Sequence, residues 1–302
     1  MTLLDKAIVR MLPVVPKPVV QLFSAPYIAG STLPEAVEVV RALNLKGKLA
    51  TVDVLGEEIT RGSEAEAIAQ AYCDALTAIE REHLDSNVSV KPTAFGLNLS
   101  YDRCRENLET VLREAARYGN FVRIDMEDSA TTSDTLRMYR ELREKGFDNV
   151  GVVLQAYLRR TLDDIRSLAD LKPNVRLCKG IYVEPPAIAF TDYDAVRANY
   201  VRSLDALLEA EAYVGVATHD EWLICEALKR VAGMNPSDYE FQMLLGVREQ
   251  RADELVAAGH RLRVYVPFGE HWYQYSLRRL QENPAMAGTI AKATVGRLVG
   301  RS

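Results

Sequence analysis

The chain has 302 residues, enough for one large α/β domain, and its hydrophobic share of 48% is ordinary for a globular protein. Its formal net charge is −5 and it contains no long basic run, which argues against a nucleic-acid-binding protein. Its four cysteines are scattered, with neither a CxxC pair nor a Cys/His metal spacing, so we expect reduced thiols, no disulfides and a cytoplasmic protein.

The amino terminus reads MTLLDKAIVRMLPVVPKPVVQLF, an apolar stretch that charged residues and three prolines interrupt. These breaks argue against a signal peptide or a transmembrane helix. The segment predicts a short amphipathic helix followed by a Pro-rich connector. We therefore expect residues 1–45 to form a helical arm that packs on the main domain, with peripheral contact at the inner face of the cell membrane as the alternative.

Short runs of β-branched and apolar residues then alternate with helical patterns along the rest of the chain. The predicted strands cover residues 49–55, 88–91, 121–125, 150–155, 175–179, 212–218, 239–244 and 261–266. The predicted helices cover residues 63–83, 101–118, 133–145, 161–168, 192–211, 221–231 and 248–258, and a last helix is expected from Gly269 to Asn283. This alternation predicts a closed (β/α)8 TIM barrel over residues 46–302. An open Rossmann sheet is disfavoured because neither GxGxxG nor GxxxxGK[ST] occurs.

Polar residues stand at or near the carboxyl ends of most predicted strands, which is where barrel enzymes carry their chemistry. They are Lys91, Asp125, Gln155, Lys179 with Gly180, Thr218 with His219, and Tyr265. Each alone is explained by a solvated lysine, a helix cap, a satisfied core amide or a structural imidazole. Their agreement over six strands indicates a site at this end of the barrel.

Side chains alternate along a strand, and Arg176 and Lys179 have opposite parity. Both therefore cannot point into the barrel from regular β-structure. If Arg176 faces the interior, we expect irregular backbone at Gly180 to turn Lys179, which glycine permits.

The last predicted helix carries a charged face that includes Tyr275, Arg278, Arg279 and Glu282, spaced three, four and seven residues apart. Two adjacent arginines bind a carboxylate or phosphate well, because guanidinium stays protonated and donates in a planar fork. A solvated helix face with an internal Arg–Glu pair is the simpler alternative.

These residue types leave several functions open. Flavin-dependent oxidation would use Arg176, Lys179, Gln155 and His219 to stabilise negative charge on the reduced ring. Schiff-base chemistry would use Lys91 or Lys179 as the nucleophile, and Mg²⁺ chemistry would use Asp125, Glu127 and Asp128. A non-enzymatic anion-binding barrel is the remaining possibility, because fold alone does not fix function.

Seven segments together, in this order, resemble the proline dehydrogenase family. They are VSVKPTAFGL (88–97), RIDMED (123–128), VVLQAYLRR (152–160), VRLCKGIY (175–182), VATHD (216–220), EFQMLLG (240–246) and RVYVPFG…YSLRRLQEN (263–283). The resemblance implies a distorted (β/α)8 barrel with a final helix over its mouth. It also implies that FAD is the cofactor, that L-proline is oxidised to Δ1-pyrroline-5-carboxylate, and that electrons pass to a membrane quinone.

The resemblance also implies roles for individual residues. Arg278 and Arg279 would hold the proline carboxylate, Lys91 and Glu282 would extend this charge network, and Tyr182, Tyr265 and Tyr275 would line the substrate pocket. Asp125 would lie beside substrate and flavin, and Arg176 would serve both catalysis and cofactor binding. The other residues expected to bind FAD are Met126, Gln155, Lys179, Gly180, Ile181, Thr218 and His219.

Two positions depart from the family pattern. Members commonly read KGAYW where this chain has KGIYV at 179–183, and the residue after Thr-His is often Asn where Asp220 stands. The first departure changes one wall of the expected cofactor site, and the second is expected to alter a helix cap. Oxidation of 4-hydroxyproline is the alternative within the family, and Tyr275 argues against it because a ring hydroxyl would crowd that side chain.

Overall fold

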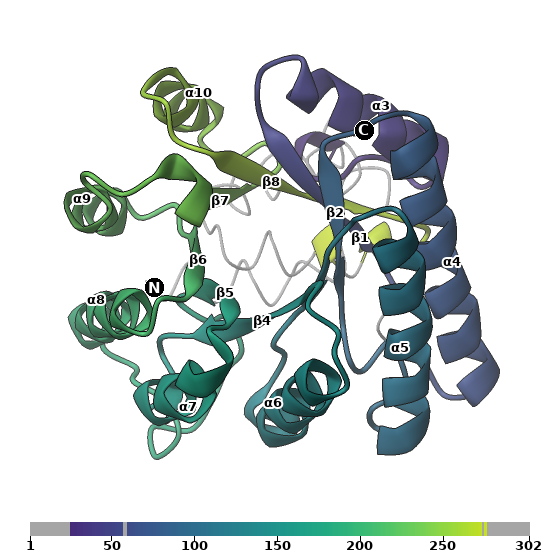
Figure 1. Cartoon of the computed structure of the whole chain (residues 1–302), viewed down its shortest axis with the longest axis horizontal. Helices are drawn as coiled ribbons and strands as arrows, with labels where there is room; N and C mark the ends of the chain where they lie inside the picture. Colours follow the sequence, from purple (N-terminus) through teal and green to yellow (C-terminus); the bar gives the residue numbers. More distant parts are fainter. Residues whose placement is uncertain (1–24, 57–58, 274, 277–302) are drawn as a thin grey trace, which may run out of the picture.

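The computed structural model describes residues 25–56, 59–273, 275 and 276. Eight parallel strands pair in sequence order and β8 pairs with β1, so the sheet closes into a barrel surrounded by helices (Figure 1). The strands are β1 (Leu49–Val54), β2 (Ser86–Val90), β3 (Val122–Ile124), β4 (Val150–Gln155), β5 (Asn174–Cys178), β6 (Tyr213–Ala217), β7 (Tyr239–Leu244) and β8 (Leu262–Phe268). The predicted (β/α)8 barrel is confirmed.

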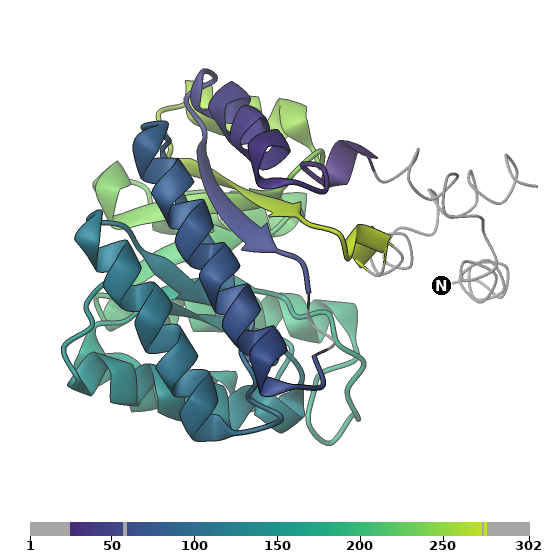
Figure 2. The same ribbon diagram turned by 90° about the vertical axis from the view of Figure 1, so that its right-hand side faces the viewer.

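The helices are α3 (Leu33–Asn44), α4 (Gly62–Arg81), α5 (Tyr101–Arg117), α6 (Ser129–Glu144), α7 (Thr161–Leu168), α8 (Tyr193–Glu209), α9 (Glu221–Arg230) and α10 (Glu249–Ala257). Helices α4 to α10 each follow one of the strands β1 to β7, as predicted for β–α units, and α3 precedes β1. Short 3-10 turns lie at Ala25–Tyr27, Ala169–Leu171 and Pro236–Asp238. Figure 2 shows α4 and α5 side by side along one flank of the barrel.

Helix α3 precedes β1 in the chain yet packs against both β1 and β8 (Figure 1). In a regular (β/α)8 barrel this outer position belongs to the helix that follows the eighth strand. The arrangement is therefore a distorted barrel. Most of the predicted N-terminal arm and of the predicted last helix lies outside the described residues.

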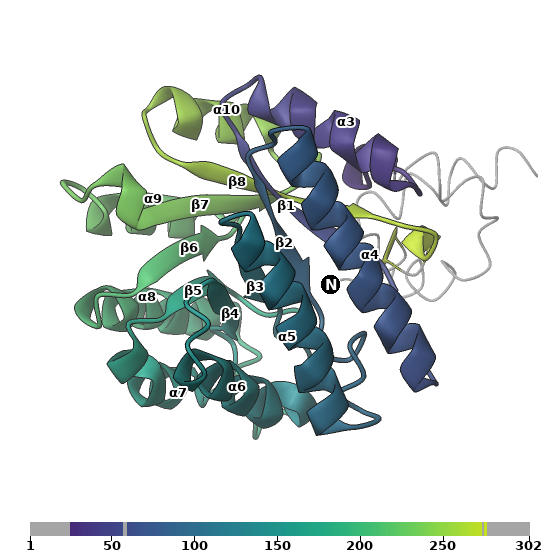
Figure 3. The same cartoon turned by 45° about the vertical axis from the view of Figure 1, so that its right-hand side comes forward.

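Most predicted boundaries lie within two residues of the observed ones, and two of the differences have a clear physical cause. Strand β8 continues through Pro267 to Phe268, beyond the predicted end at residue 266, because both residues still pair with β1 and the Phe268 carbonyl accepts a hydrogen bond from Leu55 N at 2.8 Å. Figure 3 shows this strand between β7 and β1. Helix α6 begins at Ser129 rather than residue 133, because the Asp128 carboxylate caps it by accepting from Thr131 N at 3.3 Å.

The two faces of the strands differ in chemistry. Buried apolar side chains such as Val52, Val88, Ile124 and Leu177 belong to the main core that includes the surrounding helices. The intervening residues of opposite parity, which include Asp53, Arg123, Asp125, Arg176, Glu240 and Arg263, are buried and polar or charged. The barrel interior is therefore a hydrogen-bonded polar core. No helix among the described residues is long and apolar enough to cross a membrane.

Candidate active site

Asp125 lies where several strands bring polar side chains together inside the barrel. Its Oδ1 accepts from Ser89 Oγ at 2.6 Å and from Arg176 Nη1 at 2.7 Å, and its Oδ2 accepts from Tyr265 Oη at 3.0 Å. These partners come from β2, β5 and β8. The sequence analysis predicted Asp125, Arg176 and Tyr265 for the site, and the structure brings all three into one cluster.

Lys91 extends this cluster on the β2 side. Its Nζ lies 2.7 Å from both carboxylate oxygens of Asp53 and 3.2 Å from Tyr265 Oη. Asp53 also accepts from Tyr72 Oη at 3.1 Å. Lys91, Tyr265 and Asp125 are thus joined to Asp53 in one continuous hydrogen-bonded path.

The Tyr265 hydroxyl keeps its proton in this setting. Burial raises the pKa of Tyr265 well above its ordinary value, and the negative charges of Asp125 and Asp53 raise it further. The neutral phenol can therefore donate to Asp125 while it accepts from the Lys91 ammonium.

Arg176 points into the barrel, which is the case in which irregular backbone was expected at Gly180. Its Nε donates to Gln242 Oε1, its Nη1 donates to Ser89 and Asp125, and its guanidinium carbon lies 5.3 Å from the centre of the Tyr265 ring. No hydrogen bond within the described part of the chain uses Nη2. The guanidinium can therefore still donate to a bound group.

Gln155 likewise has capacity left for a ligand. Its Nε2 donates to the Glu127 carbonyl at 2.7 Å, which fixes the amide, while its buried Oε1 has no hydrogen-bond partner among the described residues. A buried acceptor without a partner costs free energy. A donor on a bound molecule would remove that cost.

The predicted irregular backbone is present at the end of β5. Gly180 has a φ of +103°, and a Cβ at this position would lie 2.1 Å from the Tyr157 ring. The turn carries Lys179 to the neighbouring strand end, where its Nζ lies 3.5 Å from Asp220 Oδ2. Ile181 is largely exposed and Tyr182 is half-buried on the loop that follows.

Asp220 does more than cap α9. It accepts from Trp222 N at 3.2 Å, from Tyr193 Oη at 2.6 Å and from Arg197 at 2.9 and 2.7 Å. Burial opposes ionisation of Asp220, but the hydrogen bonds from Arg197 and Tyr193 and the charge of Lys179 outweigh it and lower its pKa. This departure from the family pattern thus builds an ion-paired cluster beside Lys179.

The other residues predicted to bind a cofactor lie at the same end of the barrel. Met126 and Thr218 are buried, and Thr218 Oγ1 accepts from Asp220 N at 3.1 Å. His219 Nε2 accepts from Leu244 N at 3.0 Å, so the ring is tied to β7. Tyr275 is buried, whereas Arg278, Arg279 and Glu282 lie outside the described residues.

The carboxylates considered for Mg²⁺ have separate partners. Asp125 binds Arg176 and Tyr265, Glu127 accepts from Thr93 N at 2.8 Å, and Asp128 caps α6. The described part of the chain contains no group of three or more His, Cys, Asp or Glu side chains suited to a metal ion. The Lys91 ammonium is ion-paired with Asp53, whereas a Schiff-base nucleophile needs a neutral amine.

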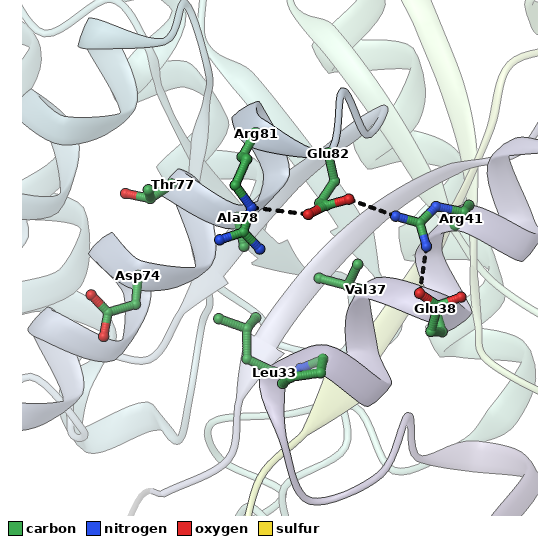
Figure 4. A pocket seen from close by; sticks show the side chains of 10 residues that line it. Leu33, Val37, Glu38, Arg41, Asp74, Thr77, Ala78, Arg81 and Glu82 are labelled. Carbon is green, nitrogen blue, oxygen red and sulfur yellow. Dashed lines mark hydrogen bonds and ion pairs between the residues drawn. The ribbon is translucent and has the colours of Figure 1, made fainter.

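A separate pocket of about 520 Å³ lies between α3 and α4, on the outer helical layer. Figure 4 shows that four of its charged side chains are paired: Arg41 pairs with Glu38 and, at 2.7 Å, with Glu82, which also pairs with Arg81 at 2.9 Å. The strand-end cluster is therefore the better candidate for a catalytic site.

Sequence reasoning missed Asp53, Ser89, Glu240, Gln242 and Arg263. Each lies inside a strand, before the carboxyl end at which polar residues were sought. The signal that identifies them is the alternation of side chains along a strand. Each of these residues is polar and points into the barrel on the same side of the sheet as a predicted site residue on the same or a paired strand.

Comparison with known proteins identifies one family. The family model described as proline dehydrogenase matches residues 36–292. Proline dehydrogenase 1 of Bacillus subtilis (strain 168) is 40% identical over 268 residues, which is 88% of each chain. Proline dehydrogenase of Deinococcus radiodurans is 36% identical over 272 residues, again 88% of each chain.

A solved structure shows the same fold. The crystal structure of proline utilization A (PutA) from Bdellovibrio bacteriovorus, inactivated by N-propargylglycine, superposes with a TM-score of 0.80 and 27% identity. The match covers 87% of this chain and 32% of that protein, so this chain spans about a third of PutA.

Proposed function

The chain belongs to the proline dehydrogenase family, and from this premise we propose that it oxidises L-proline to Δ1-pyrroline-5-carboxylate with FAD as the hydride acceptor. A membrane quinone is the proposed final electron acceptor. The observation that carries the proposal is the convergence of Asp125, Arg176 and Tyr265 on one hydrogen-bonded cluster in which Arg176 Nη2 has no partner among the described residues.

The residues at the strand ends fit a flavin. Arg176 Nη2 can donate to it, and Gln155 Oε1 can accept from it. Lys179, Thr218 and His219 would hold its phosphates and ribityl chain, with Met126 and Ile181 against the ring system. When bound, FAD supplies the acceptor for the hydride that leaves the carbon next to the ring nitrogen.

The substrate is held by charge and by aromatic rings in this proposal. Arg278 and Arg279 bind the carboxylate in a bidentate manner, with Lys91 and Glu282 in the same charge network. Tyr182, Tyr265 and Tyr275 cover the ring, and the buried Tyr275 together with the half-buried Tyr265 would exclude water from the reacting bond.

The amine has to be neutral before a hydride can leave the adjacent carbon. Proline arrives as a zwitterion, so one proton is lost in the complex. Water, or the coupled network of Asp125, Tyr265, Lys91 and Asp53, would accept that proton. Arg176 meanwhile places a fixed positive charge beside Asp125, where it stabilises negative charge that develops on the acceptor.

The proposed location is the cytoplasm, with peripheral contact at the inner face of the membrane where electrons pass to the quinone. Residues 1–45 are proposed as an arm on the barrel formed by residues 46–302. Within the arm, the structure describes α3, which packs on β1 and β8.

The visible absorbance of the purified protein, before and after anaerobic addition of L-proline, tests the proposal. We expect flavin bands that bleach on proline. Flavin bands that persist with proline but bleach with another amine would contradict the substrate, and 4-hydroxyproline is the first amine to try. A colourless protein that FAD cannot reconstitute would contradict the cofactor.

A further inference from the structure

The Arg176 guanidinium is held in one orientation by hydrogen bonds on two of its three nitrogens. Nε donates to Gln242, Nη1 donates to Asp125 and Ser89, and Nη2 has no partner within the described ranges. Because a guanidinium is planar, fixing two nitrogens also fixes the direction of the third. The contact with Gln242 therefore helps to decide where Nη2 points.

Gln242 can make this contact in only one orientation of its amide. Its Nε2 donates to Glu240 Oε1, and a carboxylate accepts hydrogen bonds but cannot donate them. The amide oxygen is consequently turned toward Arg176. If the amide were reversed, its NH₂ would face the guanidinium and its oxygen would face the carboxylate, which are two repulsive contacts.

Glu240 is itself anchored in the lower half of the barrel. Arg263 Nε donates to its Oε1 at 2.7 Å, and Tyr213 Oη donates to its Oε2 at 2.9 Å. Its side chain is 2% exposed. Burial opposes its ionisation, but the positive charge of Arg263 outweighs burial and lowers the pKa of Glu240, so it stays a carboxylate at neutral pH.

The neighbouring strand leaves room for this arrangement. A Cβ on Gly215 would lie 2.5 Å from Gln242 Nε2 and 2.9 Å from Gln242 Cδ, closer than side chains pack. Glycine at 215 on β6 therefore makes space for the Gln242 amide. Steric space and hydrogen bonding thus independently favour the same placement of that amide.

We propose that Glu240 and Gln242 are positioning residues that orient Arg176 so that its Nη2 faces the bound flavin. This inference rests on the proposed function. Neither residue touches the cofactor in this proposal: both act through Arg176, whose charge stabilises the reduced flavin. If the guanidinium is misplaced, that stabilisation is lost although every group in contact with the cofactor is still present.

The test compares Gln242→Met with Gly215→Ala. Gln242→Met removes the amide but keeps a side chain of similar length. Gly215→Ala displaces the amide without removing a polar group. We expect both to retain flavin and to lower kcat about 10- to 100-fold with a much smaller change in KM, because misplacement of a catalytic group costs up to about 100-fold. A tenfold weaker stabilisation of the two-electron-reduced flavin corresponds to a midpoint potential more negative by about 30 mV.

Tyr213→Phe is the matched control. It removes a hydrogen bond to Glu240 of similar strength but leaves the contacts from Glu240 through Gln242 to Arg176 in place. We expect it to lower Tm without moving the flavin potential. A Gln242→Met potential equal to that of wild type or of Tyr213→Phe would overturn the inference.

A second measurement needs neither flavin nor variant. The Arg176 Nε–H of the cofactor-free protein, which is hydrogen-bonded to Gln242, should exchange slowly with solvent by NMR, and fast exchange would overturn the inference. Failure of the proposed function looks different, because the wild-type protein would then bind no flavin or would not be reduced by proline.

Discussion

The Lys91 ammonium lies 2.7 Å from both carboxylate oxygens of Asp53, a residue with no exposed surface. This buried ion pair joins β1 to the residue that follows β2. Removing one member leaves an uncompensated charge in a medium of low polarity.

Asp53→Asn should therefore lower the free energy of unfolding by about 3–5 kcal/mol. The double variant Asp53→Asn/Lys91→Met should lose less unfolding free energy than the two single variants lose together, because it removes both charges. Urea unfolding of the three variants and the wild type gives the coupling energy. Additivity within about 0.5 kcal/mol would show that the pair has no special energetic role.

Asp125→Ala should retain flavin yet oxidise proline poorly. The change removes the acceptor that Ser89, Arg176 and Tyr265 share, so we expect kcat/KM to fall at least about 100-fold, the lower range for a group used in acid–base chemistry. Steady-state kinetics together with the flavin-to-protein absorbance ratio measure the two effects separately. Full turnover in this variant would remove Asp125 from the site.

Arg278→Lys and Arg279→Lys should each raise the KM for proline strongly, because a point charge does not reproduce bidentate binding of a carboxylate. Arg166→Lys, on the exposed side of α7, is the control and should leave KM unchanged. If KM stays within about twofold in both variants, the carboxylate is held elsewhere.

Gly180→Ala should lower both flavin occupancy and Tm. A methyl group here would overlap the Tyr157 ring and would also sit on backbone with a φ of +103°. Gly146→Ala separates the two effects, because Gly146 has a φ of +88° with nothing within 4 Å of the added carbon. The control should show only the conformational cost of placing a side chain on left-handed backbone, about 1–2 kcal/mol. Equal losses in the two variants would contradict a steric role for Gly180.

Asp220→Asn should destabilise the protein by about 1–3 kcal/mol at neutral pH, because Arg197 loses the carboxylate to which it donates two hydrogen bonds. The folded-state pKa of Asp220 is below its ordinary value of 3.8, so this stability is present above pH 3.8 and is lost as the pH falls through the folded-state pKa. The difference between wild type and variant should thus be constant from pH 7 to about 5 and then shrink.

Chemical denaturation of both proteins across that pH range gives this difference directly. Asp148→Asn, which changes an exposed carboxylate paired with Arg143, should alter stability by at most about 0.5 kcal/mol throughout. A difference for Asp220→Asn that grows on acidification would contradict the ion-pair account.

The order of strands could be predicted from the sequence because each strand is a short apolar run with a helix after it. Boundaries were harder where a side chain sets them. Helix α6 begins at Ser129, four residues before the predicted start at residue 133, because Asp128 caps it. The polar first turn of this helix shows little apolar periodicity. Pro267 looked like a strand end, but it is the second-last residue of β8. Only its carbonyl has to form a hydrogen bond at that position.

The site residues at the carboxyl ends of the strands could be predicted because polar residues at these positions are unusual in a barrel. The residues deeper in the barrel could not be predicted, since Glu240, Gln242 and Arg263 resemble ordinary polar residues within strands until closure of the barrel brings them together. Asp53 was missed for the same reason: its partner Lys91 lies 38 residues away, just after β2. Parity marks such residues as inward-facing, but only the closed barrel shows which of them meet.

The pairing of β8 with β1 has a consequence for synthesis of the protein. Arg263 Nη1 donates to the Ala50 carbonyl, 213 residues earlier in the chain. At about 5–20 residues per second a ribosome needs roughly 10 to 40 s between these two residues, and during that time β1 has an open edge. Asp53 and Glu240 stay in water until β8 arrives, so a nascent chain that has not yet released β8 has neither a closed sheet nor the complete set of charges inside it.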